Sequence, residues 1–372
     1  IDEVELYPYR ELINNGLASV MVAHLNVPSI ESRENYPSSL SEKVVTDILK
    51  NQLKFEGLIF TDALNMKGAS NFKQPGDIDL AAFLAGNDVL LFAENVPTAI
   101  EKFKQAFKDK LFTEERLAHS VKKILKYKYK AGLNNYCPIE FENLYTDLNK
   151  KEYKALNLEM YENAITVLKN EEEIIPIKNL DKEKIAFVKI GDGDGTFFIE
   201  KLKEYAEIDV ITTKNLDSLL VKIKDYSKVI IGYHKPEGIW KKNEMTFNEI
   251  NWIDKISKHN KTIVTFFIIF YYLLRIPTFE NTKGLIEAYQ NNEFSQIVAA
   301  EIIFGAKDAK GVLPVSLKKN FSANDGIPTK NVQRLGFAFP EQVNMNSEVL
   351  AKIDAIANYA IKSKATPGMQ IL

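Results

Sequence analysis

Residues 57–70 read "GLIFTDALNMKGAS", and this stretch indicates an α/β fold. It opens with a short, continuous apolar run, which is typical of a strand covered on both faces in a parallel sheet. Asp62 comes just after that run. Ligands and catalytic groups of α/β proteins gather at the carboxyl ends of parallel strands, so Asp62 is the first candidate functional residue. The alternative is that Thr61 and Asp62 only cap a following helix.

Strand and helix patterns alternate on both sides of this stretch, through residues 1–135. The apolar spacing predicts strands at 17–25, 57–61 and 87–93, and helices at 39–53, 78–86, 97–109 and 113–131. Strand–helix units in succession predict a parallel sheet.

A second α/β domain is predicted over residues 151–338, after a turn-rich linker at 136–150. It opens with a helix near 151–168, and its strands are expected at 184–190, 209–212, 228–234, 262–268 and 284–290. The sheet is expected to be parallel or mixed, between layers of helices. Residues 339–372 add a helix with one apolar face and then "TPGMQIL", which begins like a strand.

Composition limits the classes of partner. The 372 residues include 48 Lys and Arg against 50 Asp and Glu, for a net charge of −2, so no basic surface for a nucleic acid is indicated. The longest apolar run, 263–274, is too short to span a bilayer as a helix. One cysteine, Cys137, excludes an intrachain disulfide and leaves the compartment open. A neutral or weakly charged ligand fits best, and the oligomeric state stays open.

Three segments in order carry a family resemblance: "ASVMVAHLNVPSI", "PSSLSEKVVTDILKNQLKFEGLIFTDALNMKGA" and "AAFLAGNDVLLF". Together they resemble the later part of the barrel in glycoside hydrolase family 3, in its bacterial β-N-acetylglucosaminidase branch. "AYQNNEFSQIVAAEIIFGAKDAKGVLPVSL" resembles the end of the second domain of that family. The resemblance covers roughly residues 1–335 and implies the C-terminal part of a (β/α)8 TIM barrel followed by an α/β sandwich domain.

The resemblance gives Asp62 a role. In the family, the Asp of the TD-x-L-x-M-K-G-A stretch is the catalytic nucleophile, which forms a glycosyl-enzyme intermediate and retains the anomeric configuration. His24 follows the preceding predicted strand, so it either lines the same sugar pocket or has a structural role. Met66 follows Asp62 closely and either contacts the substrate or packs internally.

The proton donor of this branch is a His backed by an Asp, on a loop that the resemblance places before residue 1. A complete barrel needs about 250 residues, so we expect an internal fragment that is inactive alone and poorly soluble or oligomeric. "IDAIANYAIKSKATPGMQIL" resembles the opening of a serine β-lactamase-like domain, which we expect over 339–372.

Neither a metal nor a cofactor is expected. "GDGDG" at 191–195 lacks the full glycine pattern of a dinucleotide site and the ligand spacing of a calcium loop, so we interpret it as a turn. No histidine lies in a spacing typical of metal ligands.

The leading hypothesis is a retaining exo-β-N-acetylglucosaminidase that acts on cell-wall muropeptides or chitin-derived sugars, in the periplasm or outside a bacterial cell. Three alternatives stay open. The first is a β-glucosidase of the same family whose acid/base is a Glu of the second domain, and the second is a non-catalytic carbohydrate-binding or scaffold module. The third is a serine hydrolase whose chemistry lies in a C-terminal domain that is expected to be missing from this chain.

Overall fold

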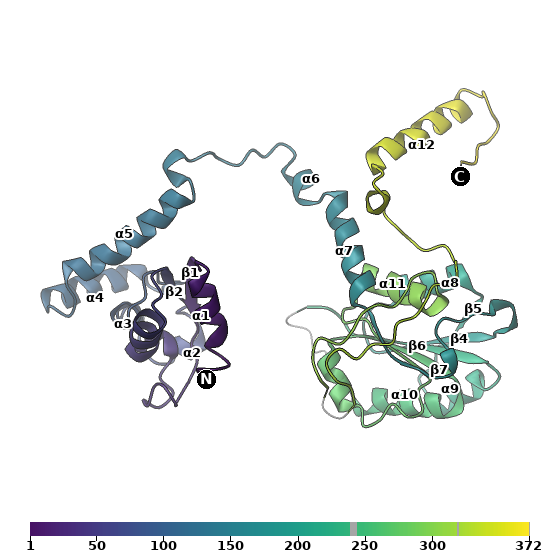
Figure 1. The fold of residues 1–372 in the computed structure, drawn as a ribbon, viewed down its shortest axis with the longest axis horizontal. Coiled ribbons are helices and arrows are strands. Elements are labelled where there is room, and N and C mark those ends of the chain that lie inside the picture. Colours follow the sequence, from purple (N-terminus) through teal and green to yellow (C-terminus); the bar gives the residue numbers. More distant parts are fainter. Residues whose placement is uncertain (239–243, 318–319, 372) are drawn as a thin grey trace. The chain divides into compact units, whose positions relative to one another are not determined.

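The computed structural model describes residues 1–238, 244–317 and 320–371, and it divides into two compact units, Ile1–Glu140 and Phe141–Leu372 (Figure 1). Residues 239–243, 318–319 and 372, which fall in the predicted sandwich domain and C-terminal segment, lie outside the described residues. Each unit is described by itself below.

The first unit is built on two parallel strands, β1 (Ser19–Val22) and β2 (Leu58–Thr61). Its helices are α1 (Tyr7–Asn14), η1 (Ser38–Leu40), η2 (Lys43–Gln52), α2 (Lys67–Ser70), α3 (Asp77–Ala85), α4 (Val96–Lys108) and α5 (Glu114–Lys130). The helix predicted at 39–53 is therefore divided. Its longer part, η2, has wide π-type turns, and it packs Val45 and Leu49 into one core cluster with Val20 and Ile59 of the strands.

The strand predicted at 87–93 is wrong in its extent. This segment runs beside β2, but it forms a single parallel bridge, between Val89 and Phe60. Beyond that bridge, the Leu91 amide donates to the side-chain oxygen of Thr61, at 2.9 Å, so the backbone ladder stops. At Phe92 the backbone turns away with a φ of 50°.

Helix α5 is held to this sheet by the buried carboxylate of Asp88. Its Oδ2 accepts from Lys123 Nζ at 2.7 Å and from the Ile59 amide at 3.1 Å, and its Oδ1 accepts from Ser120 Oγ at 2.5 Å. Burial raises the pKa of Asp88, but the bonds from Lys123 and Ser120 outweigh it, and the net shift is downward. The carboxylate therefore stays charged inside the unit.

Short helices lie on both sides of the boundary between the two units. The first unit ends after η3 (Leu133–Asn135), and the second begins with α6 (Leu144–Leu148) and α7 (Lys151–Ala164). Cys137, the one cysteine, is exposed in the stretch that follows η3.

The second unit contains a six-stranded sheet of order β3-β8-β7-β6-β4-β5 (Figure 1). Its strands are β3 (Thr166–Asn170), β4 (Ile185–Ile190), β5 (Ile208–Val210), β6 (Lys228–His234), β7 (Thr262–Phe267) and β8 (Gly284–Glu287). All neighbouring strands are parallel except β3, which runs antiparallel to β8. The prediction of a helix up to residue 168 is wrong, because Thr166 and Val167 are buried and pair with β8 as the start of β3.

Helices cover both faces of this sheet, which makes the unit an α/β sandwich. On one face, a core cluster joins the strands to α7, α8 (Thr196–Tyr205) and α11 (Glu293–Phe304) (Figure 1). On the other face, a second cluster joins them to α9 (Leu216–Ile223) and α10 (Phe247–His259). Short 3-10 helices occupy Glu171–Glu173 (η4), Leu180–Lys182 (η5), Phe270–Arg275 (η6) and Pro340–Val343 (η7).

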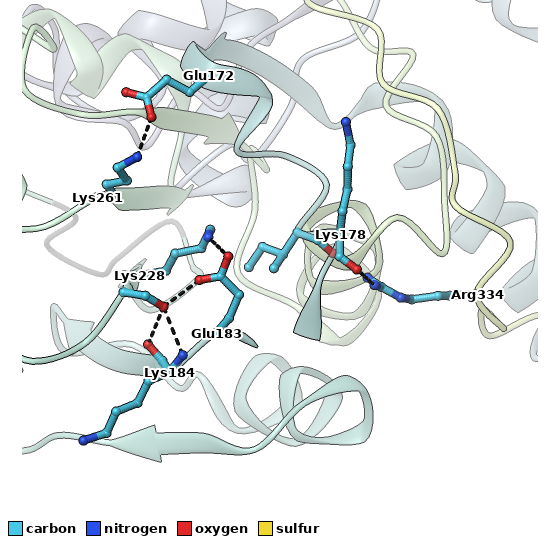
Figure 2. A network of polar contacts seen from close by, with 9 residues as sticks. Glu172, Lys178, Glu183, Lys184, Lys228, Lys261 and Arg334 are labelled. Atoms are coloured by element: carbon cyan, nitrogen blue, oxygen red, sulfur yellow. Dashed lines mark hydrogen bonds and ion pairs between the residues drawn. The ribbon is translucent and has the colours of Figure 1, made fainter. Parts of the chain in front are cut away.

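Ion pairs and backbone contacts tie loops together at the amino ends of the strands (Figure 2). Glu183 pairs with Lys228, the first residue of β6, and Lys261 before β7 pairs with Glu172 at 2.5 Å. Arg334 Nη2 donates to the Lys178 oxygen at 2.7 Å. Lys228 and Lys261 thus each form an ion pair with a glutamate in this cluster.

The C-terminal segment contains one helix, α12 (Ser347–Lys362), and none of its residues is buried. The strand predicted in "TPGMQIL" is wrong for residues 366–371, since this backbone pairs with no neighbouring strand. The start of a serine β-lactamase-like domain stays a prediction. None of the helices in the described ranges is both long and apolar enough to cross a bilayer.

Candidate active site

Asp62 lies at the carboxyl end of the first unit's parallel strands. It directly follows β2, and its amide donates to the Val22 oxygen at the end of β1, at 2.9 Å. Its side chain is half-buried, and Oδ1 accepts from the Ala63 amide at 2.7 Å. No other hydrogen bond reaches this carboxylate from residues 1–238, 244–317 and 320–371, so Oδ2 is available to a ligand.

The alternative role of Asp62 as a helix cap does not fit this geometry. Helix α2 begins at Lys67, and the residue at its N-cap position is Met66, without a capping side-chain bond. The carboxylate of Asp62 instead accepts a hydrogen bond from the amide of the next residue, Ala63.

His24 lies on the loop that follows β1 and contacts the loop of Asp62. Its Nε2 is 2.9 Å from the Ala63 main-chain oxygen, and its Nδ1 is 2.6 Å from Ser39 Oγ. The structure thus places His24 in contact with Ala63, the residue that follows Asp62. Both ring nitrogens are engaged by protein atoms.

Met66 ends the four-residue turn that starts at Ala63, directly after Asp62. Its amide donates to the Ala63 oxygen at 3.0 Å, and its side chain is 49% exposed. About half of the Met66 side chain is therefore open to solvent, and its contact with a substrate stays a prediction.

Sequence reasoning missed a buried carboxylate in the loop after β1. Glu31 accepts from Arg33 at 2.9 and 2.6 Å and from Ser41 Oγ at 2.7 Å, while the Arg33 guanidinium lies 3.6 Å from the centre of the Tyr36 ring. The Arg33 bonds hold the pKa of Glu31 well below its usual range, against the opposing effect of burial. In "ESRENYPSSLS" these charges resemble an ordinary solvated loop, which is why the pattern gave no signal.

The second unit has its own polar cluster at the carboxyl ends of its strands. His234 ends β6, is fully buried, stacks on Phe267 and has Nδ1 2.8 Å from Asn291 Oδ1. Burial lowers the pKa of His234 to about 4. A neighbouring cavity of about 480 Å³ is lined by Lys235, Glu237, Tyr272, Tyr289 and residues around them.

The "GDGDG" loop packs around His234. It connects β4 to α8, and the Gly193 amide donates to the His234 oxygen at 2.9 Å. A Cβ on Gly191 would lie 2.2 Å from that oxygen, so the loop needs glycine for close packing. The described residues hold no group of three or more His, Cys, Asp or Glu side chains that could bind a metal ion.

Comparison with known proteins finds a family model that matches most of the first unit. Residues 1–127 match the model of the glycosyl hydrolase family 3 N-terminal domain. A beta-N-acetylglucosaminidase/beta-glucosidase of Cellulomonas fimi is 27% identical over 177 residues, which cover 45% of this chain and 31% of that protein. The chain thus spans about a third of the length of the curated relatives it matches.

Solved structures share the fold of most of the chain. A glycoside hydrolase family 3 beta-N-acetylglucosaminidase from Paenibacillus sp. str. FPU-7 superposes with a TM-score of 0.66 at 22% identity, over 85% of this chain and 61% of that one. A beta-glucoside phosphorylase superposes with a TM-score of 0.69 at 22% identity, over 83% and 59% of the two chains. The match to the glycosyl hydrolase family 3 N-terminal domain thus covers residues 1–127, which lie within the first unit and include Asp62.

Proposed function

We propose that this chain carries the nucleophile of a retaining exo-β-N-acetylglucosaminidase, and that Asp62 is that nucleophile. The observation that carries the proposal is the position of Asp62. Its carboxylate follows a parallel strand within the residues that match the family model and is half-buried. One of its oxygens accepts from the Ala63 amide, and the other accepts no hydrogen bond from the described part of the chain. Ends of parallel strands are where barrel enzymes place their catalytic groups.

In this mechanism, the free Oδ2 of Asp62 attacks the anomeric carbon as the bond to the leaving oxygen breaks. A separate acid gives that oxygen its proton. Water then attacks the same carbon from the other side, releases Asp62, and leaves the sugar with its original configuration. The Ala63 amide would hold Oδ1 in place during both steps, since it already donates to that atom. Met66, exposed four residues later, would contact the sugar through its thioether.

Covalent trapping tests the role of Asp62 directly. The intact protein is incubated with a fluorinated N-acetylglucosaminyl substrate whose glycosyl-enzyme breaks down slowly, and its peptides are analysed by mass spectrometry. We expect the sugar mass on the peptide that contains Asp62. A sugar attached to a different carboxylate, or no attachment with full turnover, would contradict the proposal.

A β-glucosidase is the second candidate, because the Cellulomonas fimi relative carries both activities in its name. The ratio of kcat/KM for an aryl β-N-acetylglucosaminide and an aryl β-glucoside separates the two. The same assays with and without inorganic phosphate identify a phosphorylase, the activity named for one structural neighbour. Sugar binding without turnover would instead favour a non-catalytic carbohydrate-binding module.

A further inference from the structure

The imidazole of His24 connects three segments of the first unit. It extends from the loop after β1, contacts Ser39 of η1 through Nδ1 and contacts Ala63 of the Asp62 loop through Nε2. A carbonyl oxygen can only accept a hydrogen bond, so Nε2 carries the proton that is shared with Ala63. In the neutral ring Nδ1 is then the acceptor, and the Ser39 hydroxyl donates to it. Ser39 is fully buried, which keeps water from competing for this bond.

The main chain of His24 is fixed as firmly as its ring. Ser38 Oγ donates to the Ala23 oxygen at 2.6 Å and accepts from the Leu25 amide at 3.1 Å. The Ser38 amide donates to the Leu25 oxygen at 2.8 Å. Helix α2 packs against the same side chain, since a Cβ on Gly68 would lie 3.2 Å from the His24 Cβ. The ring therefore has little freedom to swing toward a bound sugar.

Ala63 connects the contacts of His24 to the carboxylate of Asp62. Its oxygen accepts from His24 Nε2 and from the Met66 amide, while its amide donates to Asp62 Oδ1. The backbone conformation of Ala63 thus determines the direction of the Asp62 carboxylate. His24 constrains that conformation from outside the loop.

We propose that His24 is a positioning residue, which aims Asp62 through Ala63, and that Ser39 holds the ring in its Nε2-protonated form. The inference rests on the proposed function of Asp62. A neutral imidazole has one donor and one acceptor, and both are used within the protein, so His24 does not bind the sugar. Of the two roles expected from the sequence, a contact in the sugar pocket and a structural role, this proposal favours the structural one and makes it a role in orienting the proposed nucleophile.

Two substitutions at His24 separate its two nitrogens. In His24→Gln, the side-chain amide can reach the position of Nε2 and donate to the Ala63 oxygen. In His24→Asn, the shorter amide occupies the position of Nδ1 only. In the intact protein, we expect His24→Asn to lower kcat about 10²-fold with little change in KM, because misplacing a reacting group has an effect of this size. His24→Gln should recover about tenfold of that loss, the worth of one hydrogen bond.

Ser39→Ala tests the second part of the proposal and leaves the imidazole in place. Without the Ser39 donor the ring can adopt the other tautomer, whose bare Nε2 faces the Ala63 oxygen, so kcat should fall while KM is kept. His119→Gln, an exposed position on α5, is the matched control and should behave as wild type. If both His24 variants fail to fold, Ser39→Ala alone decides, and an unchanged kcat there overturns the proposal.

Nitrogen-15 NMR of histidine-labelled intact protein provides a readout independent of activity. The spectrum of His24→Gln identifies the His24 signal, which should show a protonated Nε2 in wild type and a tautomer mixture in Ser39→Ala. A protonated Nδ1 in wild type overturns the proposal. So does a rise in KM at constant kcat in His24→Asn, which would mean a direct sugar contact. If Asp62→Asn keeps turnover, the proposed function fails, and the tautomer still reports whether His24 holds Ala63.

Discussion

Lys123 on α5 pairs at 2.7 Å with Asp88, a residue whose side chain is fully buried beside β2. The Ile59 amide and the Ser120 hydroxyl complete the shell of the carboxylate. The pair therefore links α5, the longest helix of the first unit, to β2, the strand that directly precedes Asp62. Loss of this ion pair should lower the free energy of unfolding of the first unit.

We expect Lys123→Met to lower the free energy of unfolding of the first unit by about 3 kcal/mol, because a buried carboxylate is left without its cation. Lys122→Met, at the exposed neighbouring position, should change it by less than about 0.5 kcal/mol. Chemical denaturation followed by circular dichroism measures both. Equal free energies of unfolding for the two variants would show that the Lys123–Asp88 ion pair does not stabilise the unit.

In the complete protein, Asp62→Asn should keep the fold and abolish turnover, because the amide would remove the proposed nucleophile and nearly preserve its size. One positioned acid or base is worth about 10² to 10⁴-fold in rate, and the nucleophile should cost at least as much. Asp47→Asn, at an exposed position on η2, is the control and should keep full activity.

A second test of the role of Asp62 is to add azide to the Asp62→Ala variant and analyse the configuration of the product. The anion can enter the space of the missing carboxylate and attack the anomeric carbon, which yields a glycosyl azide of inverted configuration. A product that retains its configuration would show that azide does not replace Asp62.

Glu31 should make the first unit sensitive to acid. Its pKa is depressed in the folded state, chiefly by Arg33, so its contribution is present above the pKa of an unfolded Glu and is lost as pH falls toward the folded value. Glu31→Gln should cost about 1–2 kcal/mol at pH 7, since Arg33 is 53% exposed and its charge is screened. The difference between wild type and variant should shrink below pH 4. A constant difference from pH 7 to 3 would exclude this linkage.

His234 should make the second unit lose stability between pH 6.5 and 4. Its folded pKa of about 4 lies below the value of about 6.5 for an unfolded His, so the unfolded state takes up the proton first as pH falls. The expected loss reaches about 3 kcal/mol at pH 4. His234→Asn keeps an amide donor toward Asn291 and should remove this slope.

Tryptophan fluorescence follows that transition selectively, because both tryptophans lie beyond residue 140 in the sequence. Trp252 of α10 packs against one of the two cores of the second unit. Equal pH slopes for wild type and His234→Asn would mean that His234 is not the titrating group.

Much of the strand pattern was predictable because buried parallel strands have continuous apolar sequences. Strands β4, β6 and β7 and the position of Asp62 after β2 follow from such runs. Strand β3 was missed, since "TVLKN" directly follows a helix and becomes a strand only by pairing with β8. The run at 87–93 failed for the opposite reason, because the Thr61 side chain takes the place of a backbone partner.

The site was predictable only in part. Asp62 follows a recognisable strand, and Met66 lies in the same motif. The contacts of His24 join residues that are 15 and 39 positions apart, and no local spacing indicates them. Whether a histidine binds a ligand or holds a loop depends on which atoms face its two nitrogens, and this is a property of the tertiary structure.

The exposed thiol of Cys137 lies within a few residues of the division between the two units. Because it is the only cysteine, a maleimide dye would label the chain at one defined point without any substitution. The tryptophans of the second unit then serve as donors for resonance energy transfer to that dye. One labelled sample can thus report how the distance across the division responds when a sugar binds.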